Sequence, residues 1–344
     1  MDESLTKTLS FAPQTAMPRR SLLKLGLLTA AAGVSSSIAG CAGPNRVTAR
    51  RPPRQRVARV AHLSDWHIQP ELRAGQGAAQ CLHHVQSLDD APSLVITGGD
   101  LVMDAYDQGG DRTKQVFDLF TSTVRSECAL KVAHTLGNHD IWGWNKSKSG
   151  LSGTEKGYGK DYAVDRLGMP GRYYAFDIGS GPGSWRAIVL DSVRQSRQPG
   201  SFGYEAFLDE PQADWLAATL RDTPSDRWVC VVSHIPIISA SSLFDSKPGT
   251  PLRLHSALMH DDARNIHDLF MRYPNVRLAL SGHIHQIDRV EYGGMTYICG
   301  GAVCGAWWKG PHNGCHEGYG IVDLNNDGTF DWAYQRYGWE AQPA

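Results

Sequence analysis

The stretch Lys131-Val-Ala-His-Thr-Leu-Gly-Asn-His-Asp140 indicates the fold class, because it joins a short apolar run to a cluster of polar side chains. A short apolar run that ends at a glycine is typical of a buried strand. The stretch Leu94-Val-Ile-Thr-Gly-Gly-Asp100 has the same design, with an apolar run, two glycines and an acid. Both stretches therefore predict buried strands that carry chemically active side chains at their carboxyl ends.

The same alternation of apolar and amphipathic stretches continues along the chain and predicts an α/β fold. After residue 287 the pattern changes to a hairpin that turns at Gly293-Gly294 and a second strand pair around Asn325-Asn-Asp-Gly328, which predicts an antiparallel finish. The other expected strands are residues 57–63, 187–190, 228–233 and 276–281, and the expected helices lie near residues 74–88, 111–126, 211–220 and 261–273.

Five polar motifs follow predicted strands in chain order. Alone, an Asp-x-His is usually an ordinary turn, and a histidine at a strand end is usually a hydrogen-bonded core residue. Together they form a pattern, because the carboxyl ends of strands meet at one edge of an α/β sheet. Carboxylate, amide and imidazole ligands suit Fe, Mn or Zn. The motifs are Asp65-Trp-His67, Gly98-Gly-Asp100, Gly137-Asn-His-Asp140, Ser233-His234 and Gly282-His-Ile-His285.

With these motifs, residues 58–310 resemble the calcineurin-like metallophosphoesterases, whose pattern is D-x-H, G-D, G-N-H-D/E, H and G-H-x-H. The segment with Gly203, Gln212, Trp215 and Leu216 is similar to another family segment. The resemblance implies a four-layer α/β/β/α sandwich of two mixed β-sheets flanked by helices, with a centre of two metal ions (Fe, Mn or Zn). It assigns Asp65, His67, Asp100 and His285 to one ion, and Asp100, Asn138, His234 and His283 to the other, with Asp100 bridging.

The resemblance also implies a mechanism for hydrolysing phosphate mono- or diesters. Two ions about 3.5–4 Å apart generate a bridging hydroxide that attacks phosphorus in line. His139 would stabilise the developing charge and protonate the leaving oxygen, or have a purely structural role. Asp140 would fix the tautomer of His139. The expected substrate is a small phosphoester of nucleotide, cyclic-nucleotide or phospholipid-headgroup type.

Some features near the motifs bear on the substrate. Purple acid phosphatases carry a tyrosine ligand where this chain has Met103, so a purple-type site is not expected. The Asp-x-His start with the Gly-His-x-His finish is more similar to the cyclic-nucleotide phosphodiesterase-like branch, which includes simple phosphomonoesterases and diesterases. In the Gly-rich loop after the last motif, Trp307, Trp308 and Lys309 are candidates to bind substrate, but one tryptophan packing inward is an equal alternative. Residues 145–160 are expected to form a mobile flap or an insertion without a role, and residues 239–255 a second wall. His312, Cys315 and His316 are expected to shape the pocket.

The N-terminal 41 residues predict export. Arg19-Arg20 precedes an apolar run with one charge, as in twin-arginine signals read by the twin-arginine translocase. Ile38-Ala-Gly-Cys41 resembles a lipobox, which would make Cys41 a lipidation site, whereas a small-residue peptidase site is the alternative. Residues 42–57, rich in Arg and Pro, are expected to be a tether. We therefore expect a protein in the periplasm, or one anchored by lipid on the extracytoplasmic side, with residues 58–344 as its catalytic domain.

The distribution of charge bears on nucleic acids. Residues 1–60 hold ten of the 34 basic residues and two of the 35 acids, so the rest of the chain carries a net charge of −9. Proteins that hold long polyanions need basic surfaces, so we expect no stable nucleic-acid binding. A nuclease and a metal-binding, non-catalytic scaffold are the alternatives to a phosphoesterase. Cys304 and Cys315 are a candidate disulfide in an oxidising compartment.

Overall fold

Buried strands pair into two sheets that pack face to face in the computed structural model, which describes residues 53–196, 202–245, 249 and 251–342. The first sheet has the order β13-β12-β1-β2-β3, and the second has the order β10-β11-β9-β8-β5-β4. A small separate hairpin pairs β6 with β7. The strands are β1 (Arg56–Leu63), β2 (Leu94–Thr97), β3 (Lys131–Ala133), β4 (Tyr174–Ile178), β5 (Trp185–Val189), β6 (Val193–Gln195), β7 (Tyr204–Ala206), β8 (Trp228–Val232), β9 (Val276–Ser281), β10 (Ile287–Tyr292), β11 (Met295–Gly300), β12 (Gly318–Asn325) and β13 (Phe330–Arg336).

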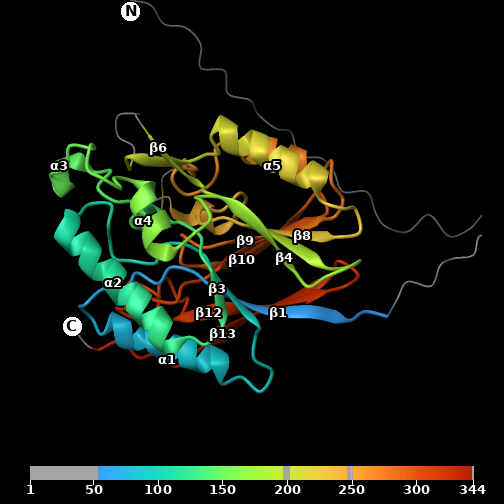
Figure 1. The fold of residues 1–344 in the computed structure, drawn as a ribbon, viewed down its shortest axis with the longest axis horizontal. Helices are drawn as coiled ribbons and strands as arrows, with labels where there is room; N and C mark the ends of the chain where they lie inside the picture. The colour runs from blue at the N-terminus through green and yellow to red at the C-terminus, as the bar shows by residue number, and fades with distance from the viewer. Residues whose placement is uncertain (1–52, 197–201, 246–248, 250, 343–344) are drawn as a thin grey trace, which may run out of the picture. The chain divides into compact units, whose positions relative to one another are not determined.

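Helices cover the outer faces of the two sheets and complete four layers. Helices α1 and α2 lie against the first sheet, and α5 lies on the opposite outer face (Figure 1). This arrangement confirms the α/β/β/α sandwich. The helices are α1 (Ala74–Gln86), α2 (Gly110–Glu127), α3 (Lys146–Ser149), α4 (Lys160–Leu167), α5 (Glu210–Asp222) and α6 (Ala263–Phe270), with 3₁₀ turns η1 (Asn138–Asp140) and η2 (Ser241–Asp245).

The two-residue period of the strands divides the core into layers. In β8, Val229 and Val231 pack toward the second sheet's helices, whereas Cys230 and Val232 pack between the sheets. In β1, Val60 packs between the sheets and Ala61 packs toward α1 and α2. Both sheets therefore bury their two faces, which explains the nearly continuous apolar runs in the sequence.

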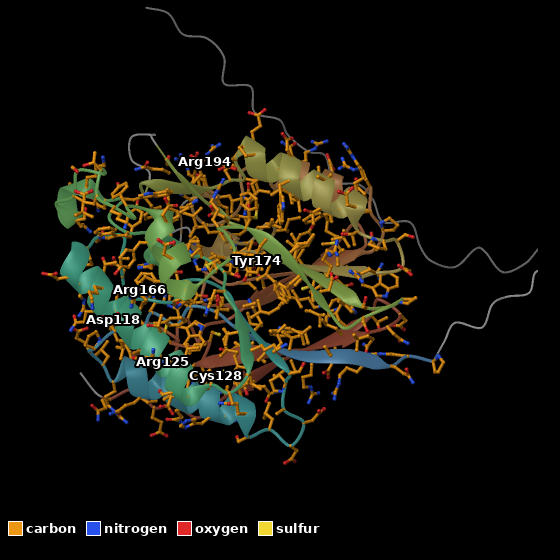
Figure 2. The ribbon with its side chains drawn as sticks, viewed as in Figure 1. Asp118, Arg125, Cys128, Arg166, Tyr174 and Arg194 are labelled. Carbon is orange, nitrogen blue, oxygen red and sulfur yellow. The ribbon has the colours of Figure 1, made fainter. Side chains whose placement is uncertain are left out.

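Local sequence signals fix several element ends. Helix α5 begins after Asp209, whose carboxylate accepts a hydrogen bond from Gln212 N at 3.1 Å. The β10–β11 hairpin turns at Gly293 and Gly294, which have φ angles of 60° and 83°, as the sequence predicts. Helix α4 joins α2 through an ion pair between Arg166 and Asp118, whose side chains lie side by side (Figure 2).

The predicted export segment falls outside the described residues. The twin arginines, the lipobox-like site with Cys41 and nearly all of the tether precede residue 53. The first strand begins at Arg56, two residues before the predicted start of the catalytic domain. None of the helices in the described part of the chain is long and apolar enough to cross a membrane.

His62 of β1 should make the folded domain sensitive to mild acid. Its ring is buried, neither ring nitrogen has a hydrogen-bond partner, and burial lowers its pKa to about 4. An unfolded histidine takes up its proton near pH 6.5. The unfolded state therefore binds more protons between about pH 6.5 and pH 4, and the domain loses stability as the pH falls through that window.

Between pH 7 and pH 5 the wild type should lose about 2 kcal/mol more unfolding free energy than His62→Leu, because the variant has no buried imidazole to protonate. Urea denaturation of the metal-free wild type and variant at both pH values measures this difference. If both proteins lose the same free energy, His62 is not the source of the acid sensitivity.

Candidate metal centre

The five motifs meet at one end of the sandwich. Strands β1, β2 and β3 run parallel in the first sheet, and β8 and β9 run parallel in the second. Their carboxyl ends thus bring together side chains from both sheets. The structure gathers there all seven residues predicted as ligands, which are Asp65, His67, Asp100, Asn138, His234, His283 and His285.

Six contacts arrange the ligand atoms around two centres that share Asp100. In the first group, His67 Nε2 lies 3.1 Å from His285 Nε2 and 3.5 Å from Asp100 Oδ2, and Asp65 Oδ1 lies 3.3 Å from His285 Nε2. A second group surrounds His234. The Nε2 atom of His234 lies 3.2 Å from Asp100 Oδ2, 3.2 Å from Asn138 Oδ1 and 3.1 Å from His283 Nδ1.

The protonation of the rings leaves acceptor atoms facing one another. His234 Nδ1 donates to Gly98 O at 2.7 Å and His285 Nδ1 donates to Gly305 O at 2.5 Å, so the Nε2 atom of each ring is left to bind a proton or a metal ion. Burial and nearby imidazoles lower the pKa of His283 to about 3 and that of His67 well below its ordinary value. These two rings are therefore neutral and present lone pairs.

The carboxylates of Asp65 and Asp100 favour positive charge on the groups next to them. Burial lowers the pKa of His234, but Asp100 outweighs it and raises that pKa to about 9. Asp65 likewise raises the pKa of His285 against the effect of burial. Around a metal ion with metal–ligand bonds of about 2.1 Å, neighbouring ligand atoms lie about 3.0–3.5 Å apart, and the acceptor atoms here have that spacing. The donor set therefore fits metal ions, which would supply the missing positive charge.

The backbone is strained where it presents these ligands. Left-handed φ angles are rare for residues other than glycine and persist where surrounding structure enforces them. Here hydrogen bonds between the ligand loops enforce them. His283 N of the second sheet donates to Asp65 Oδ2 of the first at 2.9 Å, and Asp65 N donates to Gly99 O within the first sheet at 3.0 Å. Five of the seven predicted ligands have such angles, namely Asp65 (57°), His67 (40°), Asp100 (51°), His283 (71°) and His285 (56°).

Two motif glycines are required by close approach to the carboxylates. A Cβ atom at Gly137 would lie 2.2 Å from Asp100 Oδ1, and one at Gly282 would lie 2.3 Å from Asp65 Oδ2. Any larger residue would therefore displace a predicted ligand, which explains why glycine stands at both positions.

His139 is positioned next to both groups and lines the same cavity. Its ring meets the His67 ring edge to face, with centroids 4.7 Å apart, and its amide donates to Asp100 Oδ1 at 2.8 Å. The nearest carboxylate to its ring is Asp104, whose Oδ2 lies 3.9 Å from His139 Nδ1. Asp104 was not predicted from the sequence as a site residue, although it lies only four residues after Asp100.

Asp140 does not contact the ring of His139, so the predicted role in fixing that tautomer is wrong. Its carboxylate accepts hydrogen bonds from three backbone amides, at Leu101 (2.7 Å), Val102 (3.2 Å) and Gly137 (2.8 Å). Burial and the neighbouring Asp100 raise the pKa of Asp140 to about 7, and the amide donors act against that rise. Asp140 therefore links the segment that follows Asp100 to the turn that holds Asn138.

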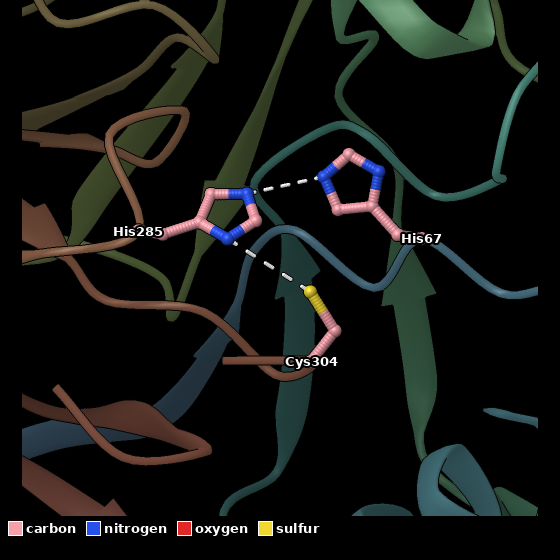
Figure 3. A group of neighbouring side chains, drawn as sticks. All are labelled: His67, His285 and Cys304. Atoms are coloured by element: carbon pink, nitrogen blue, oxygen red, sulfur yellow. Dashed lines mark hydrogen bonds between the residues drawn. The ribbon is translucent and has the colours of Figure 1, made fainter. Parts of the chain in front are cut away.

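Cys304 lies beside the first group of ligand atoms, where its thiol is within 4.8 Å of one ring nitrogen of His67 and one of His285 and could join them in holding a metal ion. Figure 3 shows the His285 ring between His67 and Cys304, with a different ring nitrogen facing each. The thiol of Cys304 lies 3.9 Å from His285 Nδ1, the atom that donates to Gly305 O. Cys304 and Cys315 are both free thiols, so the candidate disulfide is wrong. The Cys315 thiol instead faces Tyr334 and the backbone of His316.

The Gly-rich loop separates its three candidate substrate-binding residues. Trp307 lines the cavity, with its ring centroid 4.7 Å from that of His285. Trp308 is buried in the core, where its indole donates to His67 O at 3.0 Å, so it cannot contact a ligand in the cavity. Lys309 is exposed and is not among the described residues that line the cavity. The alternative with one tryptophan packed inward is the correct one.

A cavity of about 730 Å³ opens in front of the ligand groups. The predicted wall at residues 239–255 is confirmed, because Ser241, Ser242 and Phe244 line it. Tyr204 also lines the cavity, although it was not predicted from the sequence. Its ring meets that of His283 edge to face, with centroids 6.2 Å apart. Of the predicted cluster, His312 lines this cavity, whereas the His316 ring pairs with Arg336.

The predicted flap does not cover this cavity. Its residues Tyr158, Gly159 and Lys160 line a second cavity of about 720 Å³. Asn145 and Lys148 bind the carboxylate of Asp107, which holds the segment in place. The family-like segment after Gly203 acts through Gln212, whose side chain bonds to both backbone groups of Asp191 at 2.8 and 2.9 Å.

The fold and this site define a metallophosphoesterase domain. A family model described as calcineurin-like phosphoesterase matches residues 58–287, and the chain belongs to that family.

Known relatives within the family are distant. The 3',5'-cyclic adenosine monophosphate phosphodiesterase CpdA of Haemophilus influenzae is 25% identical over 229 residues, which are 66% of this chain and 66% of that protein. A 3',5'-cyclic-nucleotide phosphodiesterase of Nostoc is 28% identical over 174 residues, which are 49% of this chain and 58% of that protein. The match thus spans less than two thirds of these relatives. The crystal structure of a dimetal phosphatase from Danio rerio shares the fold, with a TM-score of 0.50 and 15% identity over 78% of this chain and 93% of that one.

Replacement of Asp100 should affect both ligand groups. We expect the Mn²⁺-loaded wild type to retain two ions per chain and Asp100→Ala to retain one or none, because Asp100 is the shared ligand and carries negative charge. Mass spectrometry of metal content after gel filtration measures this. His316→Ala is the matched control and should retain two ions. An Asp100→Ala protein that keeps two ions would show that the groups do not share this carboxylate.

Proposed function

We propose that this protein is an exported hydrolase of phosphate mono- or diesters that uses two metal ions. One observation carries the proposal, namely two groups of acceptor atoms that share Asp100 and face a cavity lined by His139. Family membership supports phosphoester chemistry. The names of the relatives make 3',5'-cyclic nucleotides one candidate substrate class.

The first ion would be held by Asp65, His67, Asp100 and His285, and the second by Asp100, Asn138, His234 and His283. When bound, such ions supply Lewis-acid activation of water and of the phosphoryl oxygens. Hydrolysis adds one water across the ester, since its oxygen bonds to phosphorus, the P–O ester bond breaks and the leaving oxygen takes a proton.

The residues of the chain have distinct tasks in this reaction. His139 lies at the cavity edge, where its imidazole can donate a proton to the leaving oxygen. The Asp104 carboxylate, 3.9 Å from His139 Nδ1, is the nearest negative charge to that ring and would stabilise its protonated form. The carbonyl groups of Gly98 and Gly305 hold the rings of His234 and His285 so that their Nε2 atoms face the metal positions. Trp307 and Tyr204 enclose the site and restrict the entry of water.

Export is the second element of the proposal. The Arg19-Arg20 pair and the apolar run behind it support passage through the twin-arginine translocase, and Cys41 supports a lipid anchor. The protein would then act in the periplasm or on the extracytoplasmic side of a membrane. A complete set of ligands together with His139 favours an enzyme over a non-catalytic scaffold, and the acidic catalytic region disfavours a nuclease.

We expect His139→Ala to lower kcat about 10²-fold or more while the protein keeps its metal ions, because the leaving oxygen loses its proton donor. Mn²⁺- or Fe-loaded protein is assayed on aryl phosphate mono- and diesters, 3',5'-cyclic AMP and single- and double-stranded DNA.

Three results would count against the proposal. Activity of His139→Ala within threefold of the wild type would remove His139 from the mechanism. An inert wild type that holds two ions would favour the scaffold. Cleavage of DNA in preference to all small esters would favour a nuclease.

A further inference from the structure

Two exposed aromatic side chains from different loops line the candidate active-site cavity. Phe244 is 81% exposed and Phe202 is 59% exposed, and both line the cavity. Large apolar side chains that gather at a cavity mouth indicate a binding surface, whereas single scattered ones do not. Their position directly in front of the ligand groups makes the substrate the natural occupant.

The exposure of Phe244 is fixed by the structure around it. One oxygen of Asp288, Oδ2, accepts hydrogen bonds from Ser239 Oγ (2.6 Å), Ser241 N (2.8 Å) and Ser241 Oγ (2.7 Å). Ser242 Oγ donates to Leu258 O at 3.0 Å. The short turn η2 is therefore anchored on both sides, and it holds the phenyl ring outward.

Phe202 is anchored in a similar way on a different loop. Tyr106 donates its hydroxyl to Phe202 O at 3.4 Å, and the Phe202 ring meets His255 edge to face with centroids 4.8 Å apart. Exposed aliphatic side chains belong to the same loops. We define the apolar collar as Phe202, Leu243, Phe244, Leu252 and Leu254, which are all exposed. Phe202 and Phe244 line the cavity, and the three leucines are exposed neighbours of the lining in the sequence.

The charge of the cavity limits what it can hold besides one phosphate. Among the described residues that line it there is no lysine or arginine. A second phosphate would therefore find no lysine or arginine in that lining, and only imidazoles could offer it a charged donor. The collar side chains offer no hydrogen bonds to the polar edges of a nucleobase or sugar, and the hydrogen-bonding groups of the cavity belong to other lining residues such as Ser241, Gln286 and Asn313.

We propose that the substrates are amphiphilic phosphoesters, in which one phosphate ester is cleaved beside His139 and an alkyl or acyl chain rests on the apolar collar. The inference rests on the proposed hydrolase function and specifies its substrate class. A chain on the collar removes apolar surface from water, so binding and turnover should increase with chain length.

Two phosphodiesters that differ only in the chain test this inference. Methyl and decyl p-nitrophenyl phosphate share their charge and leaving group, so the ratio of their kcat/KM values isolates the chain. We expect the wild type to prefer the decyl ester by about tenfold or more below its micelle concentration. Phe244→Ser should lower that ratio at least about threefold, and Phe244→Leu should retain it.

Tyr292→Ser is the matched control, because Tyr292 is also 59% exposed but lies at the far end of β10 and does not line the cavity. It should keep the wild-type ratio. Equal kcat/KM values for the two esters in the wild type would overturn the inference while leaving the hydrolase function intact. Preferred hydrolysis of 3',5'-cyclic AMP that falls in Phe244→Ser would also overturn it, since the collar would then serve a nucleobase. Failure to cleave any ester would overturn the hydrolase function itself.

Discussion

The convergence of acceptor atoms around Asp100 is the constraint on which the rest of this structure depends. Oxygen and imidazole atoms about 3.0–3.5 Å apart repel one another unless protons or metal ions lie between them. Strand ends from two different sheets must nevertheless hold them there, and five ligand residues adopt left-handed backbone conformations to do so. Such strain costs about 1–3 kcal/mol for each residue. The buried sandwich behind the site supplies the stability that sustains it.

Each sheet also fixes the ligands of the other. The carbonyl of Gly98, next to a strand of the first sheet, orients the His234 ring of the second. Asp65 of the first sheet accepts from the amide of His283 in the second. Hydrogen bonds of the ligand residues therefore connect the two sheets at the candidate metal centre. The positions of these residues and the packing of the two sheets depend on each other.

The sequence predicted which side chains gather at the site more reliably than it predicted their surroundings. Asp65, Asp100 and His234 follow apolar runs directly, so the position of the strand also determines the position of the side chain. The antiparallel strands near the C-terminus were also predicted from local sequence, because Gly293-Gly294 is a turn signal. In contrast, three features depend on which element packs against them in the fold. They are the hydrogen-bond partners of Asp140, the inward packing of Trp308 and the location of residues 145–160. Tyr204 and Phe244 were missed for the same reason, since an aromatic residue in a loop has no pattern that tells a cavity wall from a core residue.

The composition of the cavity couples metal binding to substrate binding. Phosphate sites in proteins usually rely on arginine or lysine, but the described lining here contains neither. An incoming phosphate ester must therefore be held by imidazoles and by the bound ions themselves. Weaker ion binding should consequently reduce both the affinity for substrate and the rate of the chemical step. Binding of an apolar chain to the collar should not depend on ion binding, because burial of a chain depends on apolar area and not on charge. On the proposed function, the ions would therefore select the phosphate and the collar would select the group attached to it.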